Sequence, residues 1–462
     1  MQVYQYKNNG YNIILDVPSG SVHVADDVLY DAVGLMNQGT EAKKAEQELA
    51  GRYSEEEVRE AMEEIAQLKK EGALFSEEPY APAIDRFTQM PVVVKALCLH
   101  IAHDCNLACR YCFAEEGEYH GRRALMSLEV GRKALDFLAG HSGFRRNLEV
   151  DFFGGEPLMN WNVVKELVAY GHEIEEKTKD TPAPKKFRFT LTTNGVLLND
   201  EIMDFCNREM HNVVLSIDGR KEVHDKMRPF RKGQGSYDFI IPKFLKFAEM
   251  RRKLGLQYYV RGTYTHWNLD FSKDVLHLAD LGFDQISVEP VVAPPEADYA
   301  IRPEDLPFLE EQYDLLAREM IRRKKAGKAF HFFHFMIDLS GGPCVYKRLS
   351  GCGSGTEYLA VTPWGDFYPC HQFVGMEEFL LGNVDEGVRR EDLVSEFKKV
   401  NVYSKEECSR CFSRFYCSGG CAANSYNFTG KINDVYEIGC RLQKKRVECA
   451  IMLKAAEAEM DI

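Results

Sequence analysis

The cysteines of this chain fall mostly into two blocks whose spacing suits iron–sulfur clusters. Of the fourteen cysteines, three lie in the first block and eight in the second. The first block is a C-x3-C-x2-C loop formed by Cys105, Cys109 and Cys112. A 4Fe-4S cube takes one thiolate per iron, so three cysteines leave one iron free to bind a group that is not protein. Chemistry can take place at that open iron.

The second block lies in the last quarter of the chain and supplies enough thiols for two closed cubes. Its members are Cys344, Cys352, Cys370, Cys408, Cys411, Cys417, Cys421 and Cys440. Two structural zinc sites with four thiolates each are the competing interpretation, because C-x2-C is also a zinc pattern. The remaining cysteines lie in apolar or helical surroundings, where a small buried hydrophobic side chain is expected; they are Cys98, Cys206 and Cys449.

Composition narrows the class of protein. With 462 residues, of which 45% are hydrophobic, the chain should fold into more than one domain. Its apolar runs fall short of the roughly twenty residues of a membrane span, and the polar residues 1–10 do not look like a signal peptide, so a cytoplasmic location is expected. In that compartment many cysteines indicate metal binding or catalysis. A net charge of -13 argues against nucleic acid as the main partner.

Residues 1–78 read as a small separate domain. Two strands of a hairpin are expected over 11–15 and 22–25, around a Pro-Ser-Gly turn. Helices should follow, and Ser54 with Glu57 forms a capping box before one of them. A hairpin followed by helices resembles a winged-helix-like domain.

Residues 92–293 should form parallel βα units, because short apolar runs alternate with helical stretches. The predicted strands are 94–101, 148–153, 187–192, 213–217, 258–263 and 285–288. Six units are too few for a closed eight-stranded barrel, and functional groups should lie at the C-terminal ends of the strands. A proline-bearing linker over 79–91 precedes this domain, a connector over 294–340 follows it, and 341–462 forms the last domain with a helical end.

Glycine-rich and polar motifs follow the predicted strands. The run G-G-E-P at 154–157 lets the backbone approach a ligand closely, although a plain turn would look the same. Asn194 after the third strand, and Ser216 and Asp218 after the fourth, can bind sugar hydroxyls or carboxylates, or else form Asx turns and helix caps. Arg261 in the fifth strand can pair with a bound carboxylate or with a carboxylate of the barrel itself.

The three-cysteine loop, with Tyr111 before its last cysteine, resembles the signature of radical S-adenosylmethionine (radical SAM) enzymes. The second block resembles their SPASM extension, which holds two auxiliary 4Fe-4S clusters, and its order after the loop favours clusters over zinc. In detail the chain resembles thioether-forming peptide maturases of the SCIFF, sactipeptide and ranthipeptide kind. The resemblance implies an α/β fold: a partial (β/α)6 barrel, an N-terminal winged-helix-like domain that binds the leader of a precursor peptide, and a C-terminal SPASM domain. A DNA-binding winged helix and a structural cap are the alternatives for the N-terminal domain.

The resemblance further implies S-adenosyl-L-methionine and three 4Fe-4S clusters as cofactors. The catalytic cluster is assigned to Cys105, Cys109 and Cys112. The nearer auxiliary cluster is assigned to Cys352, Cys370, Cys421 and, as a possible fourth ligand, Cys344. The outer auxiliary cluster is assigned to Cys408, Cys411, Cys417 and Cys440. The candidate contacts to S-adenosylmethionine are Gly154, Gly155, Glu156, Asn194, Ser216, Asp218 and Arg261.

The activity implied by the resemblance joins a cysteine sulfur to a carbon of another residue, with threonine as first choice, in a cysteine-rich precursor peptide. A flavodoxin or ferredoxin-type reductant would supply electrons. Two alternatives stay open: formylglycine formation on sulfatases under anaerobic conditions, and a non-catalytic iron–sulfur protein that transfers electrons or binds peptides. The N-terminal domain argues against the first alternative, and the intact cysteine loop with its G-G-E-P partner argues against the second.

Overall fold

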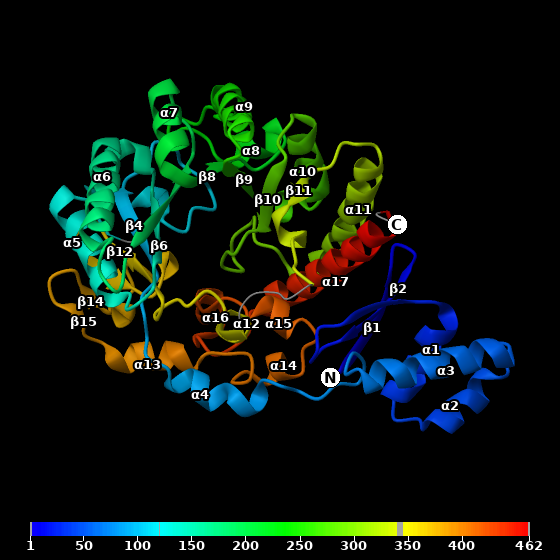
Figure 1. Ribbon diagram of the computed structural model, residues 1–462. Coiled ribbons are helices and arrows are strands. Elements are labelled where there is room, and N and C mark those ends of the chain that lie inside the picture. Colours follow the sequence, from blue (N-terminus) through cyan, green and yellow to red (C-terminus); the bar gives the residue numbers. More distant parts are fainter. Residues whose placement is uncertain (1, 120, 340–344, 461–462) are drawn as a thin grey trace.

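The computed structural model describes residues 2–119, 121–339 and 345–460 and has an α/β fold built on one 12-stranded mixed sheet (Figure 1). Seven neighbouring strands run parallel to one another. In spatial order they are β4 (Ala96–His103), β6 (Asn147–Gly154), β7 (Lys186–Thr193), β8 (Met210–Ser216), β9 (Gln257–Tyr264), β10 (Gln285–Pro290) and β11 (His331–Phe332). The first six are the six strands predicted from the sequence, which are thereby confirmed. The seventh lies in the segment that was expected to be only a connector.

The C-terminal region continues the same sheet beyond β4. There β12 (Tyr358–Val361) pairs parallel with β4. An antiparallel meander of β13 (Asp366–Tyr368), β14 (Gly382–Asn383) and β15 (Gly387–Val388) follows, and β5 (Ala124–Leu125) pairs with the end of β4. In the described residues the path of the sheet ends at β11 and β15, so the sheet is open. The C-terminal domain is therefore joined to the barrel-like sheet by strand pairing, which the sequence did not predict.

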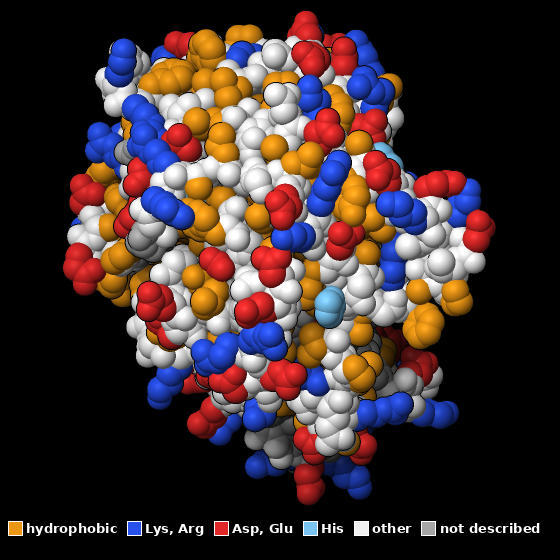
Figure 2. Space-filling model, turned by 90° about the vertical axis from the view of Figure 1, so that its left-hand side faces the viewer, with side chains coloured by type: hydrophobic (Ala, Val, Ile, Leu, Met, Phe, Trp, Pro, Cys, Tyr) orange, Lys and Arg blue, Asp and Glu red, His pale blue; other side chains and the backbone are white. Residues whose placement is uncertain are grey.

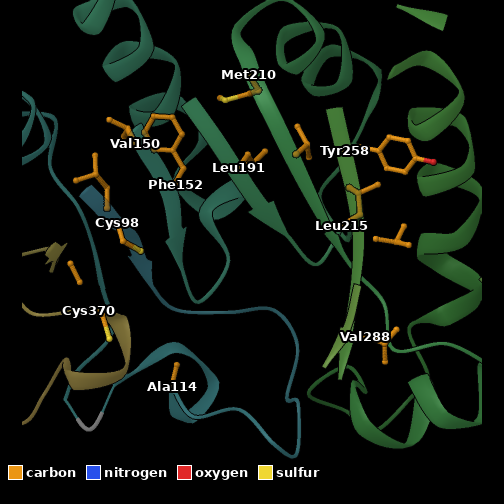
Figure 3. Close-up of a cluster of buried hydrophobic side chains, with 14 of the residues drawn as sticks. Cys98, Ala114, Val150, Phe152, Leu191, Met210, Leu215, Tyr258, Val288 and Cys370 are labelled. Carbon is orange, nitrogen blue, oxygen red and sulfur yellow. The ribbon is translucent and has the colours of Figure 1, made fainter. Parts of the chain in front are cut away.

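The helices between the parallel strands cover one face of the sheet (Figure 1). They are α5 (Leu128–His141), α6 (Trp161–Thr178), α7 (Asp200–Glu209), α8 (Lys221–Met227), α9 (Tyr237–Lys253), α10 (Phe271–Asp280) and α11 (Leu306–Lys325). Figure 3 shows apolar side chains of neighbouring strands meeting there, among them Val150, Phe152, Leu191 and Leu215. All four are fully buried. Burying each such side chain stabilises the folded state by about 1.5–3 kcal/mol. This packing holds the parallel strands, and with them the polar groups at their ends, in position.

The N-terminal region is a three-stranded antiparallel sheet in the order β1-β2-β3, followed by three helices. The elements are β1 (Val3–Asn8), β2 (Tyr11–Asp16), β3 (Val22–Ala25), α1 (Asp27–Asn37), α2 (Ala42–Leu49) and α3 (Glu55–Lys70). The predicted hairpin is confirmed as β2 and β3, and the capping box of Ser54 and Glu57 is present at α3. The sequence prediction missed β1.

This N-terminal sheet packs against other parts of the chain on both of its faces. One of its faces packs on α1, α2 and α3. Its other face, with Tyr6, Ile13 and Leu15, is buried against the C-terminal region. The ring of Tyr4 also stacks on Phe412, with ring centroids 3.7 Å apart. The expected linker is likewise ordered, as η1 (Ala81–Ala83) and α4 (Ile84–Gln89), because a proline in the first turn is compatible with a helix.

The C-terminal region is mostly helical after its strands. Its helices are α12 (Val345–Ser350), α13 (Glu391–Lys399), α14 (Glu406–Ser409), α15 (Arg414–Cys417), α16 (Ala422–Thr429) and α17 (Glu437–Met460). The expected helical end is α17, which lies along α11 (Figure 1). Single 3-10 turns complete the chain: η2 (Glu115–Gly117), η3 (Pro157–Asn160), η4 (His266–Asn268), η5 (Pro303–Asp305), η6 (Phe333–Phe335), η7 (His371–Phe373) and η8 (Glu377–Phe379).

The surface carries charges of both signs. On the face shown in Figure 2, Lys and Arg side chains are interspersed with Asp and Glu side chains. That face therefore presents no continuous basic surface of the kind that follows a nucleic-acid backbone. Among the helices that the structure describes, none has the length and apolar character needed to cross a membrane.

Candidate active site

The three-cysteine loop begins directly after β4, which is buried along its whole length. The loop is held by backbone hydrogen bonds such as that from Ala108 N to Pro229 O, at 2.9 Å. Cys105, Cys109 and Cys112 line one cavity of about 150 Å³. Burial raises the pKa of Cys105 to about 12 and that of Cys109 to about 11. Buried thiols that need nearby positive charge to ionise are a suitable donor set for a metal cluster.

Gly154 and Gly155 lie at the end of β6, beside this loop. A Cβ atom on Gly154 would lie 2.3 Å from Ala102 O, and one on Gly155 would lie 2.2 Å from Asp104 O. Side chains at both positions would therefore clash with the backbone of β4 and of the cysteine loop. The glycines were expected to admit a ligand; in the structure they admit this backbone, while both also line the cavity.

Glu156 is buried and uses its carboxylate within the protein. Its oxygens accept hydrogen bonds from Asn194 N at 2.8 Å, Thr193 Oγ1 at 2.7 Å and Leu158 N at 3.1 Å. Burial raises the pKa of Glu156 to about 7, although these hydrogen bonds oppose the rise. Glu156 lines the cavity, but its main structural effect is to fix the end of β7 to the end of β6.

Asn194 and Ser216 both line the same cavity from the ends of β7 and β8. Asn194 Nδ2 donates to Asn106 Oδ1 at 2.7 Å and lies 3.5 Å from Cys105 Sγ. Asn194 Oδ1 accepts from Val196 N at 3.0 Å, which is an Asx turn. The Asx turn that the sequence allowed for Asn194 is therefore present, and Asn194 also lines the cavity; its contact with a cofactor stays a prediction.

Asp218 lies behind the cavity and is not one of its lining residues. Its carboxylate accepts from the hydroxyl of Tyr111 at 2.7 Å and from Thr263 N at 3.1 Å. The guanidinium of Arg228 is 3.9 Å away. Burial raises the pKa of Asp218 to about 6, and Arg228 opposes the rise. The structure thus gives Asp218 the role of holding Tyr111 and Arg228 in place.

Arg228 is a cavity residue that the sequence did not single out. It lines the cavity beside the thiols, and its Nη1 donates to the hydroxyl of Tyr111 at 2.7 Å. Its Nε is buried and has no hydrogen-bond partner within the described chain. A buried cation with a free donor suits an anionic group in the cavity. Several other basic residues surround Arg228 in the sequence, so no local pattern distinguished it.

Arg261, the cation that the sequence did single out, does not line this cavity. Its Nη2 lies 3.0 Å from Glu289 Oε1, across neighbouring strands β9 and β10. Arg261 is the largest favourable influence on Glu289, whose pKa is held at about 2 in spite of burial. The structure therefore supports the alternative that the sequence allowed, an ion pair within the barrel.

The thiols of the second block come together in two groups. The pKa of Cys370 is raised by burial and, next, by the nearby Cys421, with Cys352 also contributing. Burial raises the pKa of Cys417 to about 12, and the neighbouring thiols of Cys440, Cys408 and Cys411 add to that rise. These two groups are the ones that the resemblance to the SPASM extension assigned to the nearer and outer auxiliary clusters. Cys344, the possible fourth member of the nearer group, lies outside the described residues.

All described cysteines are free thiols. Cys98, Cys206 and Cys449 are buried in the apolar core, as the sequence predicted. Within the described residues, no three His, Cys, Asp or Glu side chains gather tightly enough to hold a single metal ion. A 4Fe-4S cube takes its thiolates on separate irons and so holds them farther apart than one ion does.

Comparison with known proteins agrees with this geometry. Residues 99–288, which include the cysteine loop and strands up to β10, match the Radical SAM superfamily. This part of the chain is therefore a radical SAM domain. An uncharacterized protein of Archaeoglobus fulgidus is 26% identical over 87% of this chain and 88% of its own length. The cysteine-type anaerobic sulfatase-maturating enzyme of Clostridium perfringens is 25% identical over 69% of this chain and 85% of its own length.

Solved structures share the fold. The structure of anSMEcpe with bound AdoMet superposes with a TM-score of 0.66 at 20% identity, covering 79% of this chain and 96% of that protein. Streptococcus suis SuiB bound to its precursor peptide SuiA superposes with a TM-score of 0.52 at 14% identity, covering 95% of this chain and 98% of SuiB. At these identities the likeness concerns the fold, including, for SuiB, the N-terminal and C-terminal regions.

Proposed function

We propose that this protein is a radical SAM maturase that forms a thioether between a cysteine sulfur and a carbon of another residue, threonine first, in a cysteine-rich precursor peptide. The observation that carries the proposal is the cavity at the end of β4, where the three loop thiols, strand-end polar groups and one cation line the same space. Two further groups of thiols in the C-terminal region add to it.

Three 4Fe-4S clusters and S-adenosylmethionine fit the donor groups that the structure brings together. Cys105, Cys109 and Cys112 would hold the cluster that receives S-adenosylmethionine. The auxiliary clusters would take the two thiol groups of the second block, and the fourth ligand of the nearer one would be Cys344 or a group from outside the chain. When bound, the reduced cluster and S-adenosylmethionine supply a carbon radical that can take a hydrogen atom from an unactivated carbon.

The residues of the cavity would bind and orient S-adenosylmethionine. Arg228 would hold its carboxylate, because this side chain offers a buried charge and a free Nε donor. Ser216 and Asn194 would bind polar groups of the cofactor from the ends of β8 and β7. Glu156 and Asp218 would position these neighbours.

The peptide substrate would be recruited by the N-terminal region. In the described chain β3 pairs only with β2, so its other edge is available for addition of a peptide strand. Val24 on β3 is 49% exposed. A SuiB structure is named for its bound precursor peptide, and its fold covers nearly all of this chain, which is consistent with leader binding. Electrons would come from a flavodoxin or ferredoxin-type protein.

Formylglycine formation is the second candidate. It is favoured by the sulfatase-maturating relatives, one of which is 25% identical over 85% of its length. The three strands and three helices before the radical SAM domain favour a precursor peptide with a leader instead, because the open edge of their sheet can pair with a peptide strand.

The proposal is tested by searching the neighbouring open reading frames for a short cysteine-rich peptide and using that peptide as the substrate. The reconstituted protein, S-adenosylmethionine and reductant are incubated anaerobically with that peptide. Thioether formation lowers the peptide mass by two hydrogen atoms and removes one thiol from alkylation by iodoacetamide. Formylglycine gives an aldehyde that reacts with a hydrazide probe, and this result would replace the first candidate by the second. An unchanged peptide, with the cofactor cleaved, would refute this substrate.

A further inference from the structure

A second cavity, of about 280 Å³, lies between the barrel and the C-terminal region. Glu289 and Pro290 reach it from the end of β10. The rest of its wall comes mainly from the segment between α15 and α16 and from α17. Cys417, Cys421 and Cys440 are among its lining residues, so the cavity touches both thiol groups of the second block.

Two residues that line this cavity each carry a buried polar atom that has no hydrogen-bond partner in the described part of the chain. Arg446 is only 8% exposed; its Nε donates to the hydroxyl of Tyr313 at 2.8 Å, but its Nη2 has no hydrogen-bond partner among the described residues. Asn424 Oδ1 is also buried and, within the same described residues, has no partner. Leaving a buried polar group unpaired costs about 1–3 kcal/mol. Two such groups lining one cavity indicate a ligand that satisfies both.

Arg446 stands apart from Cys440, the candidate cluster ligand on the same helix. It follows Cys440 by six residues of α17, which corresponds to about 9 Å along the helix axis. The backbone of Arg446 is therefore more than one helical turn away from that of Cys440, so we expect an iron–sulfur cluster on the thiols to leave this part of the cavity to another molecule.

The free groups define the chemistry of that molecule. Arg446 offers a cationic N–H donor and Asn424 offers an acceptor. A carboxylate would satisfy Arg446 but would face the oxygen of Asn424 with another acceptor. An ammonium group would satisfy Asn424 but would be repelled by Arg446. A neutral amide carries a carbonyl acceptor and an N–H donor and satisfies both.

We propose that this cavity binds one neutral amide group of the substrate peptide, with Arg446 Nη2 donating to its carbonyl oxygen and Asn424 Oδ1 accepting from its N–H. This inference rests on the proposed function, because it takes the substrate to be a peptide. The amide is either a backbone peptide group or the side chain of Asn or Gln. Binding it here holds the neighbouring part of the peptide beside Cys421 and Cys417, between the two thiol groups.

The test uses a pool of short synthetic peptides with one fixed cysteine and randomised flanking positions. Immobilised, cluster-reconstituted full-length protein is loaded with S-adenosylmethionine, without reductant, and the retained peptides are sequenced by mass spectrometry. Arg446→Met and Asn424→Leu should each retain the pool roughly tenfold more weakly, since each removes one hydrogen bond to a buried polar group. Lys454→Gln, on an exposed part of α17, should retain it like the unaltered protein.

Iron content, S-adenosylmethionine affinity and thermal unfolding are measured for each variant. These controls separate loss of a cluster or of the fold from loss of peptide binding. If one variant fails to fold, the other variant alone tests the inference. Enrichment of Asn or Gln at one distance from the cysteine identifies a side-chain amide. If peptides are retained equally whatever side chains they carry, and N-methylation of one peptide bond abolishes that retention, the bound group is a backbone amide. Enrichment of Asp or Glu, or retention that neither folded variant weakens, overturns the inference alone. If the unaltered protein retains no peptide, the peptide substrate of the proposed function fails with it.

Discussion

Replacement of Arg228 should sharply weaken the binding of S-adenosylmethionine. Arg228 lines the cavity with the three thiols, and its buried Nε lacks a partner in the described chain. A hydrogen bond to a charged group contributes about 1.5–3 kcal/mol. Since each 1.4 kcal/mol is a factor of ten, Arg228→Gln should raise the dissociation constant roughly 10- to 150-fold. Arg228→Lys keeps the charge but loses the guanidinium fork, so its loss should be smaller.

The matched control is Arg261→Gln, which removes the same charge from a residue that pairs with Glu289 outside this cavity. Its affinity for S-adenosylmethionine should stay unchanged. The Arg228→Gln variant also leaves the buried carboxylate of Asp218 without its nearby cation. The double variant Asp218→Asn with Arg228→Gln removes that unpaired charge, so an affinity loss that persists in it comes from the lost contact with the cofactor.

Anaerobic titration calorimetry of the cluster-reconstituted variants measures this affinity. Equal affinities of Arg228→Gln and the unaltered protein would refute the assignment of the cofactor carboxylate to Arg228. Equal losses in the Arg228 and Arg261 variants would refute the distinction between a cavity cation and a barrel ion pair.

Three further predictions concern the clusters and the peptide edge. Reconstituted protein should contain about twelve irons per chain, whereas about four irons with bound zinc would contradict the auxiliary clusters. Cys370→Ala should lose iron and thioether formation, and Cys344→Ala should keep more iron; equal iron loss would make Cys344 an ordinary ligand. Because Asp16 N donates to Ser21 O, alternation along the hairpin points the Val24 N–H to the free edge of β3. Val24→Pro should therefore weaken leader binding without changing uncoupled cofactor cleavage, and unchanged leader affinity would argue against strand addition.

The central strands could be predicted because their signal is local. Each of the six predicted strands is a short segment in which apolar residues recur, and it lies between helical stretches, so the local sequence pattern identifies it. The grouping of the cysteines came from the resemblance to the SPASM extension; for Cys408, Cys411 and Cys417 it also agrees with their closeness in the chain. Cys440, which lies in the first turns of α17, joins this group only through the tertiary fold.

The remaining features depend on contacts between distant segments. β14 and β15 have two residues each, too few for a periodic signal, and exist because they pair with one another and with β13. Arg228 could be recognised as a site residue only from the folded structure, in which it lines the cavity with the three thiols. The sequence indicated that the glycines of 154–157 allow a close approach, but only the fold shows that the backbone of β4 and of the cysteine loop is what approaches them. Docking of the N-terminal sheet depends on side chains such as Ile13, whose apolar partners lie in the C-terminal region.

Cofactor cleavage by the cysteine loop is the central claim, and formation of 5'-deoxyadenosine measures it most directly. Reconstituted protein with reductant and S-adenosylmethionine should produce 5'-deoxyadenosine. The variant with Cys105, Cys109 and Cys112 all changed to Ala should produce none, while its auxiliary clusters remain visible by absorption and electron paramagnetic resonance. Continued formation of 5'-deoxyadenosine by that variant, or its absence from the intact reconstituted protein, would contradict the assignment of a radical SAM active site to this loop.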